Sequence, residues 1–216
     1  MSSAKELRDR FRRLPKADRE AHQGFSIRVW RALSWLERAE DMETSDIEGR
    51  FISCWIGLNA LYGRLDKNHR SWGDREAMGT FLANIWKLDH GRCIHALLGK
   101  RKSPILHLID DKYLSSDYWE LGRSEASRSL QKDVRKAIMG YTHPNRLPLL
   151  QLLFDRLYVM RNQVFHGAST KGSRLNRRTL TTSANILLAF LAACLGTMID
   201  HGLEEDWGRV CFPPKD

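Results

Sequence analysis

Hydrophobic side chains recur every three or four residues along most of the chain, which is the period of an amphipathic α-helix. Strict alternation of polar and apolar residues, typical of strands, is nearly absent. The pattern therefore indicates an all-α fold. It predicts helices over Phe25–Asp41, Ile47–Tyr62, Asp74–Asp89, Ser124–Met139 and Thr179–His201, with shorter helical pieces over Gly91–Asp111 and a loop over Tyr113–Gly122.

The helix over Ile47–Tyr62 has the clearest start. Asp46 lies directly before it, where its carboxylate can accept hydrogen bonds from the first turn, and acidic Glu48 lies within that turn. Asn59 is the one polar residue in the apolar face of this helix. Two interpretations stay open: an amide that fixes helix register, or a residue that orients a functional side chain.

Another helix is predicted between Pro148, which can occupy a first helical turn, and Gly167, which can end a helix. One face of this segment is apolar, which is typical of a helix in a bundle. That face consists of Leu149, Leu150, Leu153, Leu157, Met160 and Val164.

The opposite face of the same helix combines polar residues with large apolar neighbours. Asp155, Asn162 and His166 follow at spacings of seven and four residues, so they share one stripe. The stripe is flanked by Leu152, Tyr158, Val159 and Phe165. This combination predicts a contact surface with reactive groups. Arg161 lies roughly 140° from His166 on an ideal helix, so the pair meets only through a distorted last turn, a curled arginine or a second copy of the chain.

Composition favours one well-packed domain with anionic partners. The chain has 216 residues, 42% of them hydrophobic, and a formal net charge of +9. This charge favours partners that carry phosphate. Residues 1–20 predict a basic amphipathic helix, and residues 168–178 a basic loop without acids. The cations of that loop, which we expect to bind substrate, are Lys171, Arg174, Arg177 and Arg178. The helix over Ser124–Met139 is also basic, with Leu130, Val134 and Ile138 expected to face inward.

The cysteines and histidines do not indicate a metal or cofactor site. The four cysteines form no C-x-x-C pair, and His90, Cys93 and His95 match no standard ligand spacing. No secretory signal is apparent, which predicts a cytoplasmic protein with free thiols. The apolar run from Ile186 to Ile199 is shorter than the roughly 20 residues that span a bilayer, so we expect a buried helix and no membrane contact.

Arg161-Asn162-x-x-x-His166 resembles the R-x(4-6)-H motif of the HEPN superfamily of helical ribonucleases and nucleotide-binding proteins. The segment Phe51–Gly63 is similar to the helix that precedes this motif in several HEPN families. The resemblance covers roughly residues 25–202. It implies a HEPN-like up-and-down helical bundle with extra helices, a single domain over residues 1–216 with the N-terminal basic helix and the C-terminal tail as additions.

The resemblance also implies an activity. HEPN ribonucleases cut RNA without metal at a composite site in a homodimer, and leave a 2′,3′-cyclic phosphate and a 5′-hydroxyl. Arg161 would then stabilise phosphate charge, His166 would transfer a proton, and Asn162 would orient the histidine or contact RNA. Asp155 has no place in this motif; we expect it, like Asn59 in its functional interpretation, to orient Arg161 or His166 without contacting the substrate. Family members act as toxins controlled by an antitoxin in trans, as phage-defence effectors or in RNA processing.

Two other interpretations of the motif stay open. Arg161 could form an ion pair with Asp155 or Asp200, while His166 closes a helix C-terminus. Alternatively, the chain is a noncatalytic HEPN-like module that binds a nucleotide, RNA or a protein. An intact Arg, Asn and His favours the nuclease, because a binding module needs cations and no titrating histidine.

Overall fold

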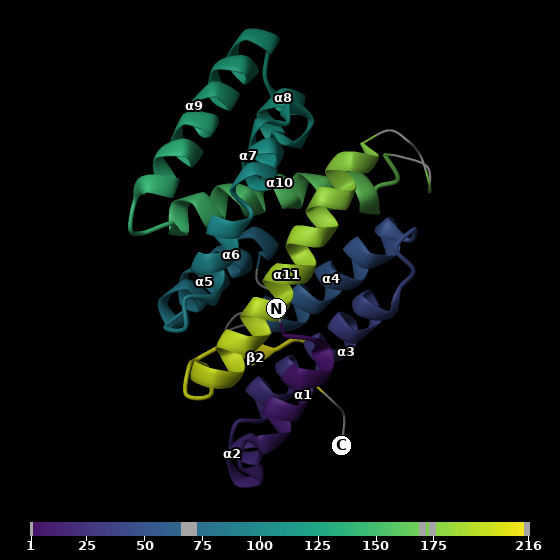
Figure 1. Ribbon diagram of the computed structural model, residues 1–216, viewed down its shortest axis with the longest axis vertical. Helices are drawn as coiled ribbons and strands as arrows, with labels where there is room; N and C mark the ends of the chain where they lie inside the picture. The colour runs from purple at the N-terminus through teal and green to yellow at the C-terminus, as the bar shows by residue number, and fades with distance from the viewer. Residues whose placement is uncertain (1, 66–72, 169–171, 173–175, 214–216) are drawn as a thin grey trace. The chain divides into compact units, whose positions relative to one another are not determined.

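The computed structural model describes residues 2–65, 73–168, 172 and 176–213. It is 78% helical, and the described residues form eleven α-helices and one antiparallel pair of two-residue strands (Figure 1). The predicted all-α fold is confirmed. Packing divides the chain into two compact units. Unit 1 comprises Met1–Ile94 and Leu187–Asp216, and unit 2 comprises His95–Ile186. The predicted single HEPN-like domain stays a prediction.

The helix bounds agree closely with the hydrophobic periodicity. Unit 1 contains α1 (Ala4–Arg13), α2 (Lys16–Ala21), α3 (Gln23–Asp41), α4 (Ile47–Tyr62), α5 (Asp74–Leu88), β1 (Arg64–Leu65) and β2 (Arg209–Val210). Unit 2 contains α7 (Lys102–Asp110), the 3-10 helix η1 (Lys112–Leu114), α8 (Ser116–Glu120), α9 (Arg123–Thr142) and α10 (Leu147–Phe165). Two helices have residues in both units: α6 (Cys93–Lys100) and α11 (Arg177–His201).

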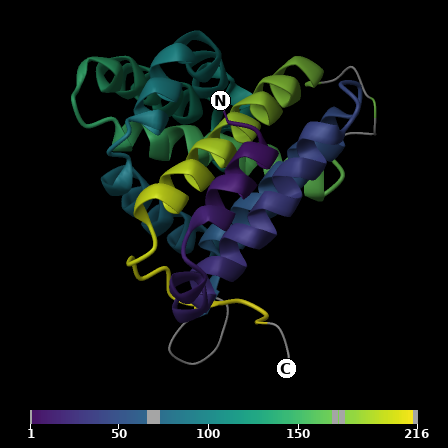
Figure 2. The ribbon, with the colours of Figure 1, turned by 60° about the horizontal axis from the view of Figure 1, so that its bottom comes forward.

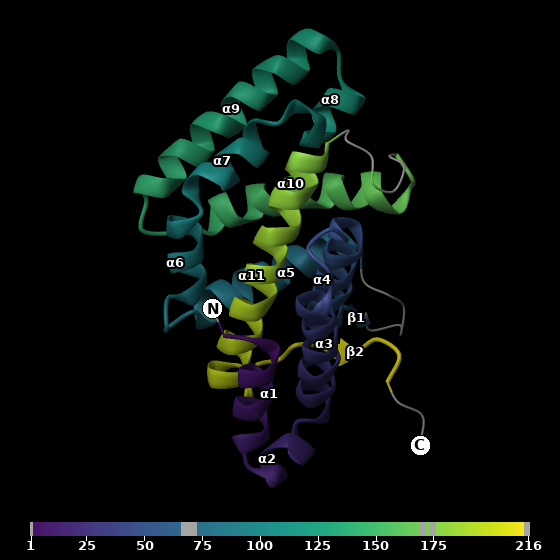
Figure 3. The ribbon, with the colours of Figure 1, turned by 45° about the vertical axis from the view of Figure 1, so that its right-hand side comes forward.

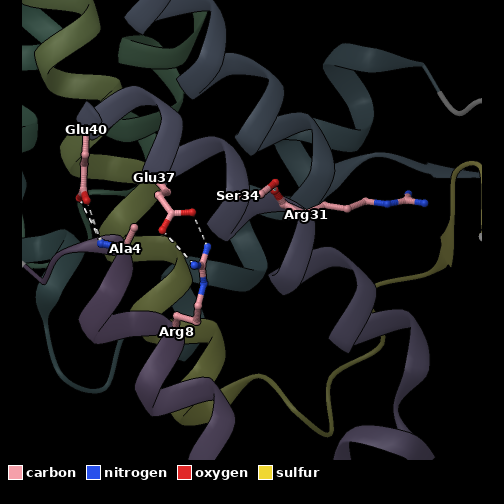
Figure 4. Close-up of polar contacts among 6 residues, drawn as sticks. All are labelled: Ala4, Arg8, Arg31, Ser34, Glu37 and Glu40. Atoms are coloured by element: carbon pink, nitrogen blue, oxygen red, sulfur yellow. Dashed lines mark hydrogen bonds and ion pairs between the residues drawn. The ribbon is translucent and has the colours of Figure 1, made fainter. Parts of the chain in front are cut away.

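In unit 1, α1 is held against α3 by its polar groups as well as by its apolar face. The backbone N–H of Ala4 donates to both carboxylate oxygens of Glu40, and Arg8 forms two hydrogen bonds with Glu37 at 2.9 and 2.7 Å (Figure 4). Leu7 and Phe11 are buried beneath them. Figure 2 shows α1 between α3 and the C-terminal half of α11. The predicted N-terminal amphipathic helix is therefore part of the packed unit.

Helix α4 begins and ends where the sequence predicts. The Asp46 carboxylate accepts a hydrogen bond from the Gly49 N–H at 3.0 Å. The expected inner face is buried: Phe51, Cys54, Trp55, Leu58, Leu61 and Tyr62. A Cβ at Gly57 would lie 2.6 Å from a Leu191 methyl carbon, so glycine allows the close approach of α4 and α11.

Figure 3 shows the β1–β2 pair beside α3. A buried arginine on α3 connects this helix to the pair and to the C-terminal segment. The Arg28 guanidinium is fully buried and donates to the carbonyl oxygens of Leu61, Gly63, Trp207, Gly208 and Arg209. Burial lowers the pKa of Arg28 to about 10, so it stays charged at neutral pH. The sequence predicts a tail over Gly202–Asp216 in which Trp207 and Phe212 can pack back; Trp207 is buried, but Phe212 is exposed. Backbone carbonyls of this tail also satisfy the Arg28 cation.

Unit 2 has its own buried arginine. Arg156 on α10 donates through Nε to the Ile109 carbonyl on α7 at 3.2 Å, and through Nη2 to the Asp133 carboxylate on α9 at 2.8 Å. Its side chain is 4% exposed. This one side chain therefore connects three helices around a core that includes Leu108, Leu153 and Leu157.

Helix α11 is longer than the apolar run in the sequence suggests. It is the one described helix that is long and apolar enough to cross a membrane by length and composition. However, 78% of its most apolar window is buried, as in the core helix of a soluble protein. Burial raises the pKa of Cys194 on α11 well above the ordinary value and that of Cys54 on α4 to about 12, which fits unreactive packing thiols.

Two local predictions are wrong. The predicted loop over Tyr113–Gly122 contains η1 and α8. Ile138, expected to face inward, is 51% exposed, whereas Ala137 beside it is buried. Periodicity shows that a helix is amphipathic. In a helix as polar as α9, however, the tertiary contacts decide which of its few apolar residues are buried.

Candidate nucleic-acid interface

The Arg161 to His166 segment lies at the C-terminal end of α10. The helix closes with a Schellman turn, in which the Gly167 N–H donates to the Val164 carbonyl at 3.4 Å and the Ala168 N–H to the Gln163 carbonyl at 2.9 Å. Gly167 has a φ of 69°, in the left-handed region that favours glycine. The prediction that Gly167 ends this helix is confirmed.

Arg161 is half-buried, and its guanidinium packs on aromatic rings. Its Cζ lies 4.8 Å from the centroid of the Phe165 ring and 5.8 Å from that of Tyr158. Nη1 donates to Asn162 Oδ1 at 3.0 Å. Ring stacking uses the face of a guanidinium and leaves its N–H edge to bind anions. Arg161 is thus held by its own helix in a conformation that can receive a phosphate group.

His166 is the C-cap residue of α10, and its side chain is exposed. Asp155 is also exposed and Asn162 is half-buried, as their helical spacing predicts. Of the apolar neighbours, Phe165 is 44% exposed, but Val159 is buried. Within the described residues, no hydrogen bond or ring contact joins Arg161 to His166. The described part of one chain therefore does not bring Arg161 and His166 into contact.

The predicted substrate-binding cations are only partly described. Lys171 and Arg174 lie outside the described residues. Arg177 is half-buried and Arg178 exposed in the first turn of α11, which contains no acidic residue. A cation in the first turn is opposed by the helix dipole, so a nearby anion would stabilise this end.

Charge is distributed unequally between the units. Unit 2 contains 16 Lys and Arg against 7 Asp and Glu, whereas unit 1 contains 19 of each. The formal net charge of +9 therefore resides in unit 2. Part of it lines a shallow hollow of about 400 Å³ on α9, formed by Arg128, Gln131, Lys132, Arg135, Lys136 and Met139. Helical spacing places its cations along one stripe.

A cluster of three aromatic rings lies beside the motif. Tyr113 on η1 and Tyr118 and Trp119 on α8 form it, and Trp119 is 61% exposed. The Gln163 side chain donates to the Tyr113 carbonyl at 2.7 Å and so joins the cluster to α10. The sequence indicates only that Tyr118 and Trp119 anchor a loop over Tyr113–Gly122. Nothing in their spacing distinguishes an exposed ring from a buried anchor.

The remaining predicted residues belong to unit 1. Asn59 belongs to unit 1, and its Oδ1 is buried with no hydrogen-bond partner among the described residues. Its predicted role in orienting Arg161 or His166 stays a prediction. Asp200, an alternative ion-pair partner for Arg161, pairs with Arg10 in unit 1. No cluster of three or more His, Cys, Asp or Glu side chains suited to a metal ion occurs in the described part of the chain.

Comparison of the chain with family models, with curated proteins and with solved structures finds no match.

Proposed function

We propose that this protein is a metal-independent endoribonuclease whose active site forms when two copies bring together the C-terminal ends of their α10 helices. The observation that carries the proposal is that Arg161, in the last turns of α10, and an exposed His166, its C-cap residue, both lie at one capped helix end. The resemblance of this motif to that of HEPN ribonucleases supports it, as does the charge of unit 2.

The chemistry requires a base, an acid and a cation. A histidine takes the proton from a ribose 2′-hydroxyl, whose oxygen attacks the adjacent phosphorus. The bond from phosphorus to the 5′-oxygen breaks, and a second histidine protonates that oxygen. The products are a 2′,3′-cyclic phosphate and a 5′-hydroxyl. Arg161 stabilises the negative charge on the phosphate oxygens in the transition state.

One chain supplies one such histidine in the motif, so the reaction needs a second copy. A two-fold interface brings identical surfaces together, and it would place His166 of each copy near that of the other. The exposed Phe165 and the half-buried Tyr158 give the C-terminal part of α10 an apolar surface for this contact. Asn162 already holds Arg161, and in the dimer it would fix the guanidinium for phosphate binding.

The test is cleavage of a labelled single-stranded RNA in EDTA by the wild-type chain, His166→Ala and Arg161→Ala. We expect both variants to lose at least about a hundredfold in rate, because each removes a group that acts in the transition state. His143→Ala is the matched control, since His143 is also exposed in unit 2 and bonds to Asn145. It should cut like the wild type, and product ends should be 2′,3′-cyclic phosphates.

Equal cutting by all four proteins would identify a contaminant and contradict the proposal. A wild-type chain that sediments as a monomer at the concentrations at which it cuts would contradict the composite site.

The second candidate is a noncatalytic RNA-binding module. The absence of a described contact between Arg161 and His166 favours it, because a binding site requires no such convergence. RNA binding by the wild-type chain, without cleavage by its dimer, would support this function. A role as a toxin or phage-defence effector, restrained by an antitoxin in trans, follows only from the nuclease.

A further inference from the structure

The rings of Tyr113, Tyr118 and Trp119 form one connected cluster on the surface of unit 2. The Tyr118 centroid lies 5.1 Å from that of Tyr113 and 5.1 Å from that of Trp119, with interplanar angles of 75° and 86°. Tyr113 is 40% exposed and Trp119 is 61% exposed. The edge-on packing lets each ring support its neighbour while the large indole stays in contact with water.

These rings are held in place although they are exposed. Trp119 Nε1 donates to the Tyr113 carbonyl at 3.1 Å, and the Tyr113 N–H donates to Asp111 Oδ1 at 3.0 Å. Leu114 and Ser115, which lie between Tyr113 and Tyr118 in the chain, are buried. A hydrogen-bonded indole N–H fixes the ring plane, so an exposed face is presented in a defined orientation. Binding of a ligand to this face therefore costs little conformational entropy, because the ring is already ordered.

The cluster is joined directly to the motif helix. The Tyr113 carbonyl accepts hydrogen bonds from both Trp119 Nε1 and Gln163 Nε2. Gln163 lies between Asn162 and His166 in the sequence. Asp111 also accepts a hydrogen bond from Thr179, next to Arg178 in the first turn of α11. A strand that contacts these rings would therefore continue towards the candidate site.

The positive charge of Lys112 favours a polyanion on the tyrosine side of the cluster. Lys112 Nζ lies 5.0 Å from the Tyr113 centroid and 5.6 Å from the Tyr118 centroid. Asp111 is engaged by Tyr113 and Thr179, and Asp117 by the Ser129 hydroxyl. Glu120 is exposed next to Trp119 and opposes phosphate on its own side. Phosphates would thus follow Lys112, with the bases turned to the rings.

We propose that Tyr113, Tyr118 and Trp119 form a stacking platform for unpaired bases of single-stranded RNA, adjacent to the Arg161–His166 site. The biological role of this platform rests on the proposed ribonuclease function. Aromatic rings bind unpaired bases by stacking, with little sequence preference. In a duplex each base is already stacked on its neighbours and offers no free face. The platform therefore selects single strands.

The test compares binding of a fluorescein-labelled 12-nucleotide single-stranded RNA and of its duplex by the full-length chain. We expect Trp119→Ala to weaken single-strand binding by about tenfold or more and to leave duplex binding unchanged. Trp119→Phe should restore most of the affinity, because it keeps a ring. The matched control is Trp30→Ala, which removes a tryptophan that is 49% exposed in unit 1 and should have no effect.

Three results would contradict the platform. They are wild-type affinity of Trp119→Ala for the single strand, equal losses of affinity for single strand and duplex, and an equal loss of affinity in Trp30→Ala.

The outcome for the platform is separable from that for the nuclease. Binding that depends on Trp119 in a chain that never cuts keeps the platform and refutes the nuclease. Cleavage that depends on His166, with single-strand affinity unchanged in Trp119→Ala, refutes the platform and supports the nuclease.

Discussion

The two units contain similar numbers of cations but use them differently. In unit 1, Arg8 pairs with Glu37, Arg10 with Asp200 and Lys87 with Glu205. In unit 2, the α9 stripe of Arg128, Lys132, Arg135 and Lys136 is accompanied on its own helix by two acids, Glu125 and Asp133, and Arg156 already engages Asp133. Unit 1 thus neutralises its cations within the fold, whereas unit 2 leaves most of its positive charge for an external anion.

The exposed tryptophans show the same contrast. Trp30 in unit 1 is covered by Arg8 and Arg12, whose Cζ atoms lie 5.5 and 5.9 Å from its ring. Arg8 is in turn paired with Glu37, so this surface is satisfied internally. Trp119 in unit 2 packs on tyrosines and leaves most of its surface to solvent. The surface of Trp30 is therefore used within the fold, whereas the exposed surface of Trp119 is available for a ligand.

The largest expected effect concerns the two buried arginines. Arg28→Met in unit 1 and Arg156→Met in unit 2 should each lower the free energy of unfolding by about 3 kcal/mol, because each leaves buried acceptors unpaired. Urea denaturation followed by circular dichroism measures the change. In unit 2 the second change Asp133→Leu should recover most of the loss, since it removes the unpaired carboxylate.

No single second change should rescue Arg28→Met, because its acceptors are backbone carbonyls. A loss below about 1 kcal/mol for Arg28→Met would show that water replaces the guanidinium, and would contradict this account of how the C-terminal segment is held.

The next effect is on RNA affinity. Replacement of Arg128, Lys132 and Arg135 by Gln should weaken single-stranded RNA binding at least about tenfold at low salt and reduce the salt-dependence slope by up to about 2. The matched control replaces Lys5, Arg13 and Arg38, which are exposed on α1 and α3 of unit 1. The control changes the net charge equally and should affect binding far less. Equal effects would mean that only total charge matters, and would remove the distinction between the units.

The smallest effect concerns two buried tyrosines. The Tyr141 hydroxyl in unit 2 is buried without a described partner, whereas the Tyr62 hydroxyl in unit 1 donates to Asp74 at 2.6 Å. Tyr141→Phe should therefore be nearly neutral at pH 7, and Tyr62→Phe should lower the free energy of unfolding by about 1 kcal/mol.

Burial raises the pKa of Tyr141 to about 12, against the opposing effect of Arg146, while Lys102 Nζ also lies 5.2 Å from the ring centroid. The folded state thus holds this proton more tightly than the unfolded chain. Stability linked to Tyr141 is complete below pH 10 and falls as the pH rises towards 12. Tyr141→Phe should be more stable than the wild type at pH 11 in the same urea titration. Parallel stability profiles from pH 8 to pH 11 would contradict the pKa shift.

Local signals in the sequence were sufficient for most elements. Asp46 and the apolar spacing predict α4 from Ile47 to Tyr62, and Gly167 predicts the end of α10. These signals act within one helical turn, so neighbouring residues carry the information. The pairing of β1 with β2 could not be predicted, because strands of two residues have no pattern and their partners are distant in the chain.

What the sequence alone determined is the all-α fold, the place of Arg161, Asn162 and His166 at one helix end, and the excess of cations. Only the tertiary structure decided that Val159 is buried while Phe165 stays exposed, and that the net charge resides in unit 2. It also decided that Trp119 is exposed beside the motif through the shared Tyr113 carbonyl. Helical periodicity arises from neighbours along the chain, whereas exposure and convergence depend on which distant segments pack together.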